Sequence, residues 1–123
     1  MTYSKTRLRD YLLHIRESIA RIEQYTSDHD ETRFFSDQLL QDAVIRNLEI
    51  IGEASRNITR NFPEIATANS NIPFAFAYDM RNALAHGYFK VDMEIVWNTI
   101  QRDLPNLDQK VADLIADTDF SDN

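Results

Sequence analysis

The sequence contains no cysteine and few of the residues that form turns. Without cysteine the chain can form neither disulfides nor thiolate metal sites. Two glycines and three prolines provide little turn material, which predicts a mostly helical protein with short connections. Glycine-rich phosphate loops, dinucleotide fingerprints and Gly-x-Ser-x-Gly elbows are excluded as well, because Gly52 and Gly87 are the only glycines.

Metal-ligand clusters and long apolar runs are also missing. The three histidines, His14, His29 and His86, lie far apart, and none has the spacing of a metal ligand. No apolar run approaches the roughly 18 residues of a membrane span, and the N-terminus carries charges too early for a secretory signal. We therefore expect a cytoplasmic protein with no metal, no other cofactor and no membrane contact.

Negative charge is concentrated at one end of the chain. The net charge is −7, and residues 103–123 hold six Asp and one Lys, a net of −5. The remaining −2 belongs to residues 1–102, so the body of the protein is nearly neutral. Ten of the thirteen cationic residues are Arg, which suits bidentate phosphate contacts better than Lys does. Arg56 and Arg60 lie one helical turn apart, and a solvated helix face is the favoured interpretation of that pair.

Apolar residues recur with helical spacing along most of the chain. Leu8, Leu12, Ile15, Ile19 and Ile22 form the first such stripe, with Ser4 as its cap. A polar turn follows at residues 27–31, and residues 64–73 are expected to be a loop or a weak turn. A further helix opens at Asp92, and Pro105 must kink it or begin a fifth piece. The first three helices are predicted at residues 4–26, 36–60 and 72–86.

These helices predict an all-α protein, a single antiparallel bundle of four or five helices. At 123 residues the chain fits one domain, expected over residues 1–116, and residues 117–123 are expected to be a disordered acidic tail. Two residues of the helix at 36–60 are unusual. Gly52 costs about 1 kcal/mol relative to Ala, which a close helix crossing or a subunit contact would explain. Asn47 lies on the apolar stripe, either as a satisfied buried amide or as part of an interface.

The stretch MRNALAHGYFKVD at residues 80–92 admits two interpretations. In the structural one, His86 stabilises a helix end, Gly87 turns the chain and Tyr88 folds back against the last turn. In the functional one, the same helix end carries a reactive site. Asn82 and His86 are four residues apart, so the amide can orient the imidazole, and Asp79 shares their face. Arg81 and His86 diverge within one chain, but two such helices across a two-fold axis could present both residues to one cleft.

That stretch resembles the Arg-x4-His-x-Tyr signature of the HEPN superfamily, as it occurs in HepT-like toxins. Two further blocks are similar to the same family and follow its order, QDAVIRNLEIIGEA at 41–54 and EIVWNTIQRDLP at 94–105. The likeness covers almost the whole chain, and Tyr78 and Asp79 depart from the family pattern. It implies a HEPN domain in a two-fold homodimer.

The resemblance also implies an activity and a partner. Arg81 would bind the scissile phosphate of RNA and His86 would act as general acid or base in a metal-independent endoribonuclease, with Asn82 and Asp79 in support. The family further implies a type VII-like toxin–antitoxin pair. Its antitoxin would be an MntA-like nucleotidyltransferase of the MNT type that adds AMP to the tyrosine of the motif, here Tyr88. The alternative is a non-catalytic, nucleotide- or substrate-binding partner subunit of a nucleotidyltransferase.

Overall fold

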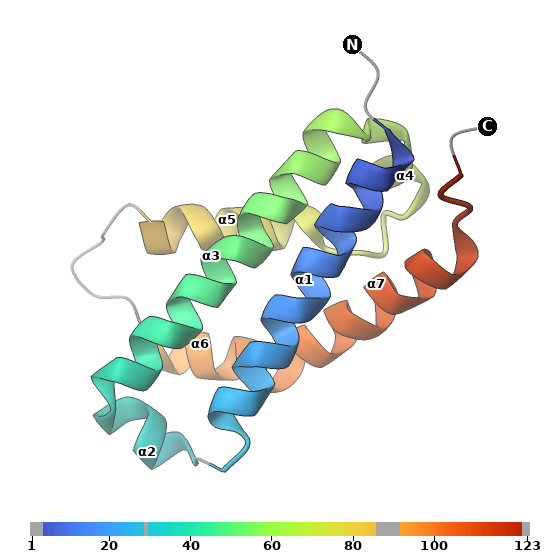
Figure 1. The fold of residues 1–123 in the computed structure, drawn as a ribbon. Helices are drawn as coiled ribbons and strands as arrows, with labels where there is room; N and C mark the ends of the chain where they lie inside the picture. Colours follow the sequence, from blue (N-terminus) through green and yellow to red (C-terminus); the bar gives the residue numbers. More distant parts are fainter. Residues whose placement is uncertain (1–3, 29, 86–91, 122–123) are drawn as a thin grey trace.

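The computed structural model describes residues 4–28, 30–85 and 92–121 (Figure 1). Within these ranges the chain forms helices and no strands, so the predicted all-α class is confirmed. The elements are α1 (Lys5–Thr26), α2 (Glu31–Ser36), α3 (Gln38–Asn61), α4 (Pro63–Ala68), α5 (Phe74–Ala85), α6 (Met93–Asn98), the π-helical stretch η1 (Thr99–Asp103) and α7 (Leu104–Asp117).

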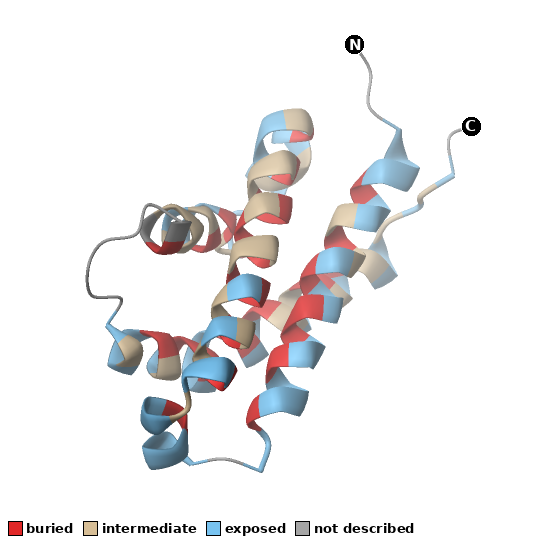
Figure 2. Ribbon diagram, turned by 60° about the vertical axis from the view of Figure 1, so that its left-hand side comes forward, coloured by how far each residue is buried: buried red, intermediate tan, exposed pale blue. Residues whose placement is uncertain are grey.

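Helix α3 lies at the centre of the fold. It packs against α1 on one side and is crossed by α5 on another, while α7 packs along α1 (Figure 1). Helices α1 and α3 run antiparallel, as the predicted bundle requires. All five residues of the first apolar stripe are buried. Figure 2 shows the buried positions of α1 and α3 turned toward each other and the exposed positions turned outward. The hydrophobic core therefore forms where the sequence pattern indicates.

Two of the predicted caps are present. The Ser4 side chain accepts a hydrogen bond from the backbone N–H of Arg7 at 3.2 Å and so begins α1. The Asp92 carboxylate accepts from the backbone N–H groups of Glu94 and Ile95 and begins α6. In each case a side-chain oxygen satisfies N–H groups that have no partner within the helix. The helix starts predicted at these residues are confirmed.

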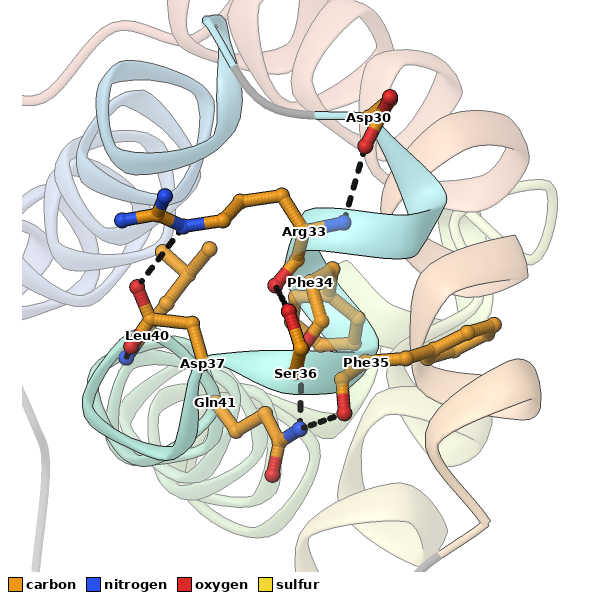
Figure 3. Close-up of polar contacts among 8 residues, drawn as sticks. All are labelled: Asp30, Arg33, Phe34, Phe35, Ser36, Asp37, Leu40 and Gln41. Carbon is orange, nitrogen blue, oxygen red and sulfur yellow. Dashed lines mark hydrogen bonds and ion pairs between the residues drawn. The ribbon is translucent and has the colours of Figure 1, made fainter.

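The polar turn predicted at residues 27–31 is too long, because α2 begins at Glu31. Figure 3 shows why the short helix forms: Asp30 accepts from the backbone N–H of Arg33 at 2.9 Å, and Gln41 donates to the carbonyls of Phe34 and Phe35. The Phe34 side chain is fully buried and its ring centroid lies 5.3 Å from that of Trp97. Capping and one buried aromatic side chain stabilise a segment that has no apolar stripe.

The prediction of a loop or a weak turn at residues 64–73 is wrong for the first half of that segment, which is helical. Residues Pro63–Ala68 form α4, with Pro63 in the first turn, where its missing N–H has no cost. Phe62, which precedes α4, is buried, and Ile65 is partly buried against the core. The apolar contacts of these two side chains hold a single helical turn in a segment rich in Asn and Ser.

A wider, π-helical turn directly precedes the first turn of α7, in which Pro105 lies. The π-helical stretch η1 directly follows α6 and directly precedes α7, and the N–H of Leu104 bonds to the carbonyl of Thr99, five residues earlier. A proline inside an α-helix removes one backbone hydrogen bond and clashes with the carbonyl four residues before it. The wider π-turn before Pro105 relieves that clash, so the predicted fifth piece begins as α7 without a break.

Beyond α7, Thr118 donates to the carbonyl of Leu114 at 2.6 Å, and Phe120 is partly buried against the core.

In the described part of the chain, no helix is both long and apolar enough to span a bilayer.

Candidate active site

Gly52 places α3 and α5 in direct contact. A Cβ atom added at Gly52 would overlap Cβ of Arg81 and would lie 2.8 Å from the carbonyl oxygen of Ala77. No L-residue with a side chain fits there unless one of the helices shifts. Of the two explanations offered by the sequence for this glycine, the close helix crossing is present.

The contact with Gly52 fixes the position at which the Arg81 side chain leaves α5. Beyond its Cβ the guanidinium meets two partners: Nη1 donates to Oδ1 of Asn82 at 3.1 Å, and Nη2 lies 3.4 Å from Oε2 of Glu53. The Arg81 side chain is 30% exposed, so it lies partly at the surface. A guanidinium fixed in this way is suited to binding a phosphate.

Glu53 is a site residue that the sequence analysis missed. Its Oε2 is shielded from solvent and makes no hydrogen bond within the described structure, although it forms the ion pair with Arg81. In the sequence, Glu53 is marked only by its position next to Gly52. The apolar pattern of α3 does not distinguish Glu53 from an ordinary surface residue.

Arg81 borders a groove of about 250 Å³ between α1, α3 and α5. Helix α3 forms its floor, and α1 contributes Tyr11 and His14. In the sequence His14 does not stand out, because no other histidine lies near it in the chain. The fold nevertheless places it on the same groove as Arg81.

Tyr78 explains one departure from the family pattern. The guanidinium carbon of Arg56 lies 5.4 Å from the centroid of the Tyr78 ring, within the range of a cation–π contact between α3 and α5. Arg56 is therefore partly engaged with α5, whereas Arg60 is exposed as predicted for a solvated helix face.

Three of the five predicted site residues lie on α5 within the described residues. Arg81 and Asn82 are in contact, and Asp79 is exposed one turn before Asn82. The amide predicted to orient His86 therefore accepts from Arg81. His86 and Tyr88 lie outside the described residues, and their roles stay predictions. Among the described residues, no three His, Asp or Glu side chains gather as metal ligands.

Comparison with known proteins identifies the family. A family model described as Ribonuclease HepT-like matches residues 15–114. The chain is 42% identical over 106 residues to Probable ribonuclease HepT of Thermococcus cleftensis, which covers 86% of this chain and 94% of that protein. It is 36% identical over 108 residues to the provisionally named RNase MJ1380 of Methanocaldococcus jannaschii, covering 88% and 96%.

A third relative is longer. MJ0434 of Methanocaldococcus jannaschii, whose name combines a gamma-glutamylcyclotransferase with a provisionally assigned RNase, is 41% identical over 113 residues. The match covers 92% of this chain but only 50% of that relative. No solved structure matches the chain. The chain belongs to the HepT-like ribonuclease family, as the resemblance of its three sequence blocks predicted.

Proposed function

We propose that this protein is a metal-independent endoribonuclease toxin with Arg81 and His86 at its active site. The observation that carries the proposal is the placement of Arg81, whose guanidinium is fixed at the surface beside a groove by Gly52, Asn82 and Glu53. RNA is the proposed substrate because the chain belongs to a ribonuclease family and its relatives are named ribonucleases.

The proposed reaction uses the 2′-OH of RNA as the nucleophile. A general base takes the 2′-OH proton while the oxygen attacks the adjacent phosphorus, and the 5′-oxygen leaves with a proton from a general acid. The products are a 2′,3′-cyclic phosphate and a 5′-OH. His86 serves as acid or base, because an imidazole titrates near neutral pH. Arg81 stabilises the negative charge that grows on the phosphate in the transition state.

One experiment tests this reaction directly. The protein is incubated in EDTA with single-stranded RNA of random sequence, and the ends of the products are determined. Cuts that leave a cyclic phosphate and a 5′-OH are expected. An oligonucleotide with a single 2′-deoxy substitution at a mapped cut is the matched control, because it lacks only the nucleophile. Cleavage at the substituted position would contradict the proposal, and no cleavage of any RNA would favour the alternative, a non-catalytic partner of a nucleotidyltransferase.

A two-fold dimer is proposed because Arg81 and His86 diverge within one chain. Five residues of helix correspond to about 140° of rotation and about 7.5 Å of rise, so the two side chains do not converge in one protomer. Across a two-fold axis each cleft can combine residues of both copies. Light scattering should report a dimer. Mixing Arg81→Ala with His86→Ala protein should restore part of the activity if one cleft draws on both chains, and no restoration would count against the composite site.

The proposed antitoxin is an MntA-like nucleotidyltransferase that transfers AMP to the Tyr88 hydroxyl. Each AMP would place a phosphodiester with about one negative charge near Arg81, where it would compete with RNA phosphate for the guanidinium. Tyr88→Phe retains the ring and removes only the acceptor. The variant should cut RNA and resist modification by the antitoxin with ATP. AMP-sized additions to Tyr88→Phe in intact-mass spectrometry would show that the acceptor lies elsewhere.

A further inference from the structure

Arg56 is a partly exposed cation that no carboxylate of the described residues neutralises. Its guanidinium carbon lies 5.4 Å from the centroid of the Tyr78 ring, and among the described residues its side chain forms no hydrogen bond. By contrast, Arg46 on α3 and Arg81 on α5 each lie near a glutamate, at 3.8 and 3.4 Å. The positive charge of Arg56 is therefore available to an anionic ligand.

Arg56 and Arg81 lie on the same side of the crossing between α3 and α5. Two contacts join the helices on that side. The first is the ion pair between Glu53 and Arg81. The second joins Arg56 to Tyr78, and each of these residues is three positions from its counterpart in the first contact. The opposite side of the crossing is apolar, and its pocket is lined by residues that include Leu48, Ile51, Phe76 and Met80.

The two guanidinium groups are held apart on successive turns of α5. Arg81 donates to Asn82, whereas Arg56 lies over the ring of Tyr78. Tyr78 and Asn82 are four residues apart, which corresponds to about 6 Å of rise along the helix. The pair is therefore placed beside one strand, with each arginine at its own anion.

The contact with Tyr78 prepares Arg56 to bind a phosphate. The five N–H donors of a guanidinium lie in its plane, so a ring against one face leaves most of them free. A long side chain that is already held also loses less conformational freedom when a ligand binds. The planar donor edge matches two phosphate oxygens at once. Arg56 thus combines an unpaired charge with a restrained position.

We infer that Arg56 binds a second phosphate of the RNA substrate, next to the scissile phosphate proposed for Arg81, and that Tyr78 positions Arg56 for this contact. The inference rests on the proposed ribonuclease function. The contact is independent of sequence, because phosphodiesters carry no base information. It would fix the direction of the strand on α5, which a single phosphate contact does not.

Binding of an uncleavable strand tests the inference without requiring activity. The probe is a fluorescent 2′-O-methyl oligonucleotide, and its affinity is measured by anisotropy between about 50 and 200 mM salt. Loss of one phosphate contact lowers the logarithmic salt slope of single-strand binding by about 0.7. Arg56→Gln should show that decrease and bind about 10-fold more weakly at the lower salt concentration. Arg9→Gln, at an exposed position of α1, removes the same charge and should leave the slope unchanged.

Two variants of Tyr78 separate phosphate binding from a purely structural contact. Tyr78→Phe keeps the ring and should bind as the wild type does. Tyr78→Leu removes the ring but leaves the charge of Arg56, so it should weaken binding about 2- to 5-fold and keep the full salt slope. If the contact only joined α3 to α5, Arg56→Gln would lower the Tm and leave the salt slope unchanged. That result would overturn the inference.

A change in the RNA alone gives a test that needs no variant. A methylphosphonate linkage carries no charge, and it is placed on either side of a mapped cut in two otherwise identical strands. Wild-type cleavage should fall about 10-fold for one of the two strands. Arg56→Gln should cut that strand and the unsubstituted strand at the same rate. Equal cleavage of all three strands by the wild type would reject the second phosphate site.

The two sets of measurements separate this inference from the proposed function. If Arg56→Gln cut RNA at the wild-type rate with an unchanged salt slope, the ribonuclease would be retained and the second phosphate site rejected. If Arg56→Gln lowered the salt slope but the wild type cut no RNA, the site would be retained and the ribonuclease rejected.

Discussion

Gly52 of α3 leaves no space between its backbone and the side chain of Arg81 on α5. A Cβ at Gly52 would overlap Cβ of Arg81 and would lie 2.9 Å from its Cγ. Arg81 is the residue proposed to bind the scissile phosphate. Its side chain therefore begins at the point where α3 and α5 touch. Because packed helices shift little, the contact fixes the position of the Arg81 side chain.

Gly52→Ala should destabilise the protein although alanine is the better helix former. The gain in helix propensity is about 1 kcal/mol, and forcing an extra carbon into a packed contact costs about 1–3 kcal/mol. We expect a lower Tm and a loss of RNA cleavage larger than the loss of folded protein, since α5 must move and carry Arg81 with it. Thermal unfolding and cleavage rates are measured on the same samples.

The control for Gly52→Ala is the reverse change at an exposed helical position. Ala20→Gly on α1 should cost about 1 kcal/mol from propensity alone and leave cleavage unchanged. If Gly52→Ala raised the Tm by as much as Ala20→Gly lowers it, helix propensity would dominate at Gly52. The contact between α3 and α5 would then contribute nothing to the stability of the protein.

Phe34→Ala should release α2 from the fold. The Phe34 side chain is fully buried against Trp97, and loss of a buried phenylalanine costs about 3–5 kcal/mol. Trp97 is the only tryptophan, so its fluorescence reports directly on this contact. A red shift at a lower urea concentration than in the wild type is expected. Phe35→Ala, at a neighbouring residue that is 42% exposed, should shift the transition much less.

Asp92→Ala should weaken the start of α6. The carboxylate accepts from the N–H groups of Glu94 and Ile95 at 3.0 and 3.4 Å, and loss of such a cap costs about 0.5–2 kcal/mol. Asp92→Asn retains a capping oxygen and should recover most of the lost stability in urea unfolding. If Asn were as destabilising as Ala, the charge of Asp92 and not its capping oxygen would be the stabilising feature.

The ion pair between α1 and α7 should contribute little and should depend on salt. Arg16 Nε lies 2.9 Å from Asp108 Oδ1, and the hydrogen bond and charge of Asp108 raise the pKa of Arg16. Because the pKa of Arg16 is raised, the charge of Arg16 is complete at neutral pH and is lost only in strong alkali, so salt is the more useful variable near neutral pH. A double-mutant cycle with Arg16→Gln and Asp108→Asn should give about 0.2–1 kcal/mol, decreasing at 1 M salt. A larger, salt-independent coupling would contradict a surface pair.

The long helices could be predicted from the sequence because each carries an apolar stripe. Helix α2 buries one side chain and α4 none, so periodicity gives no signal for either. Gly52 could be recognised as costly from the sequence, but its partner could not, because the partner depends on which helix crosses α3. Glu53 was missed for the same reason: on α3 alone it is one more surface carboxylate, and only the crossing places Arg81 beside it.

The measurement that tests the central claim most directly is the rate of RNA cleavage in EDTA by wild type, Arg81→Ala and His86→Ala. Arg21→Ala, at an exposed position of α1 outside the groove, controls for the loss of one positive charge. Circular dichroism confirms that each variant is folded. Arg81→Ala should lower the rate by about 10²–10³ and His86→Ala by about 10²–10⁴, while Arg21→Ala stays near the wild type. Equal rates in the wild type and folded Arg81→Ala would contradict the assignment of the active site to this helix end.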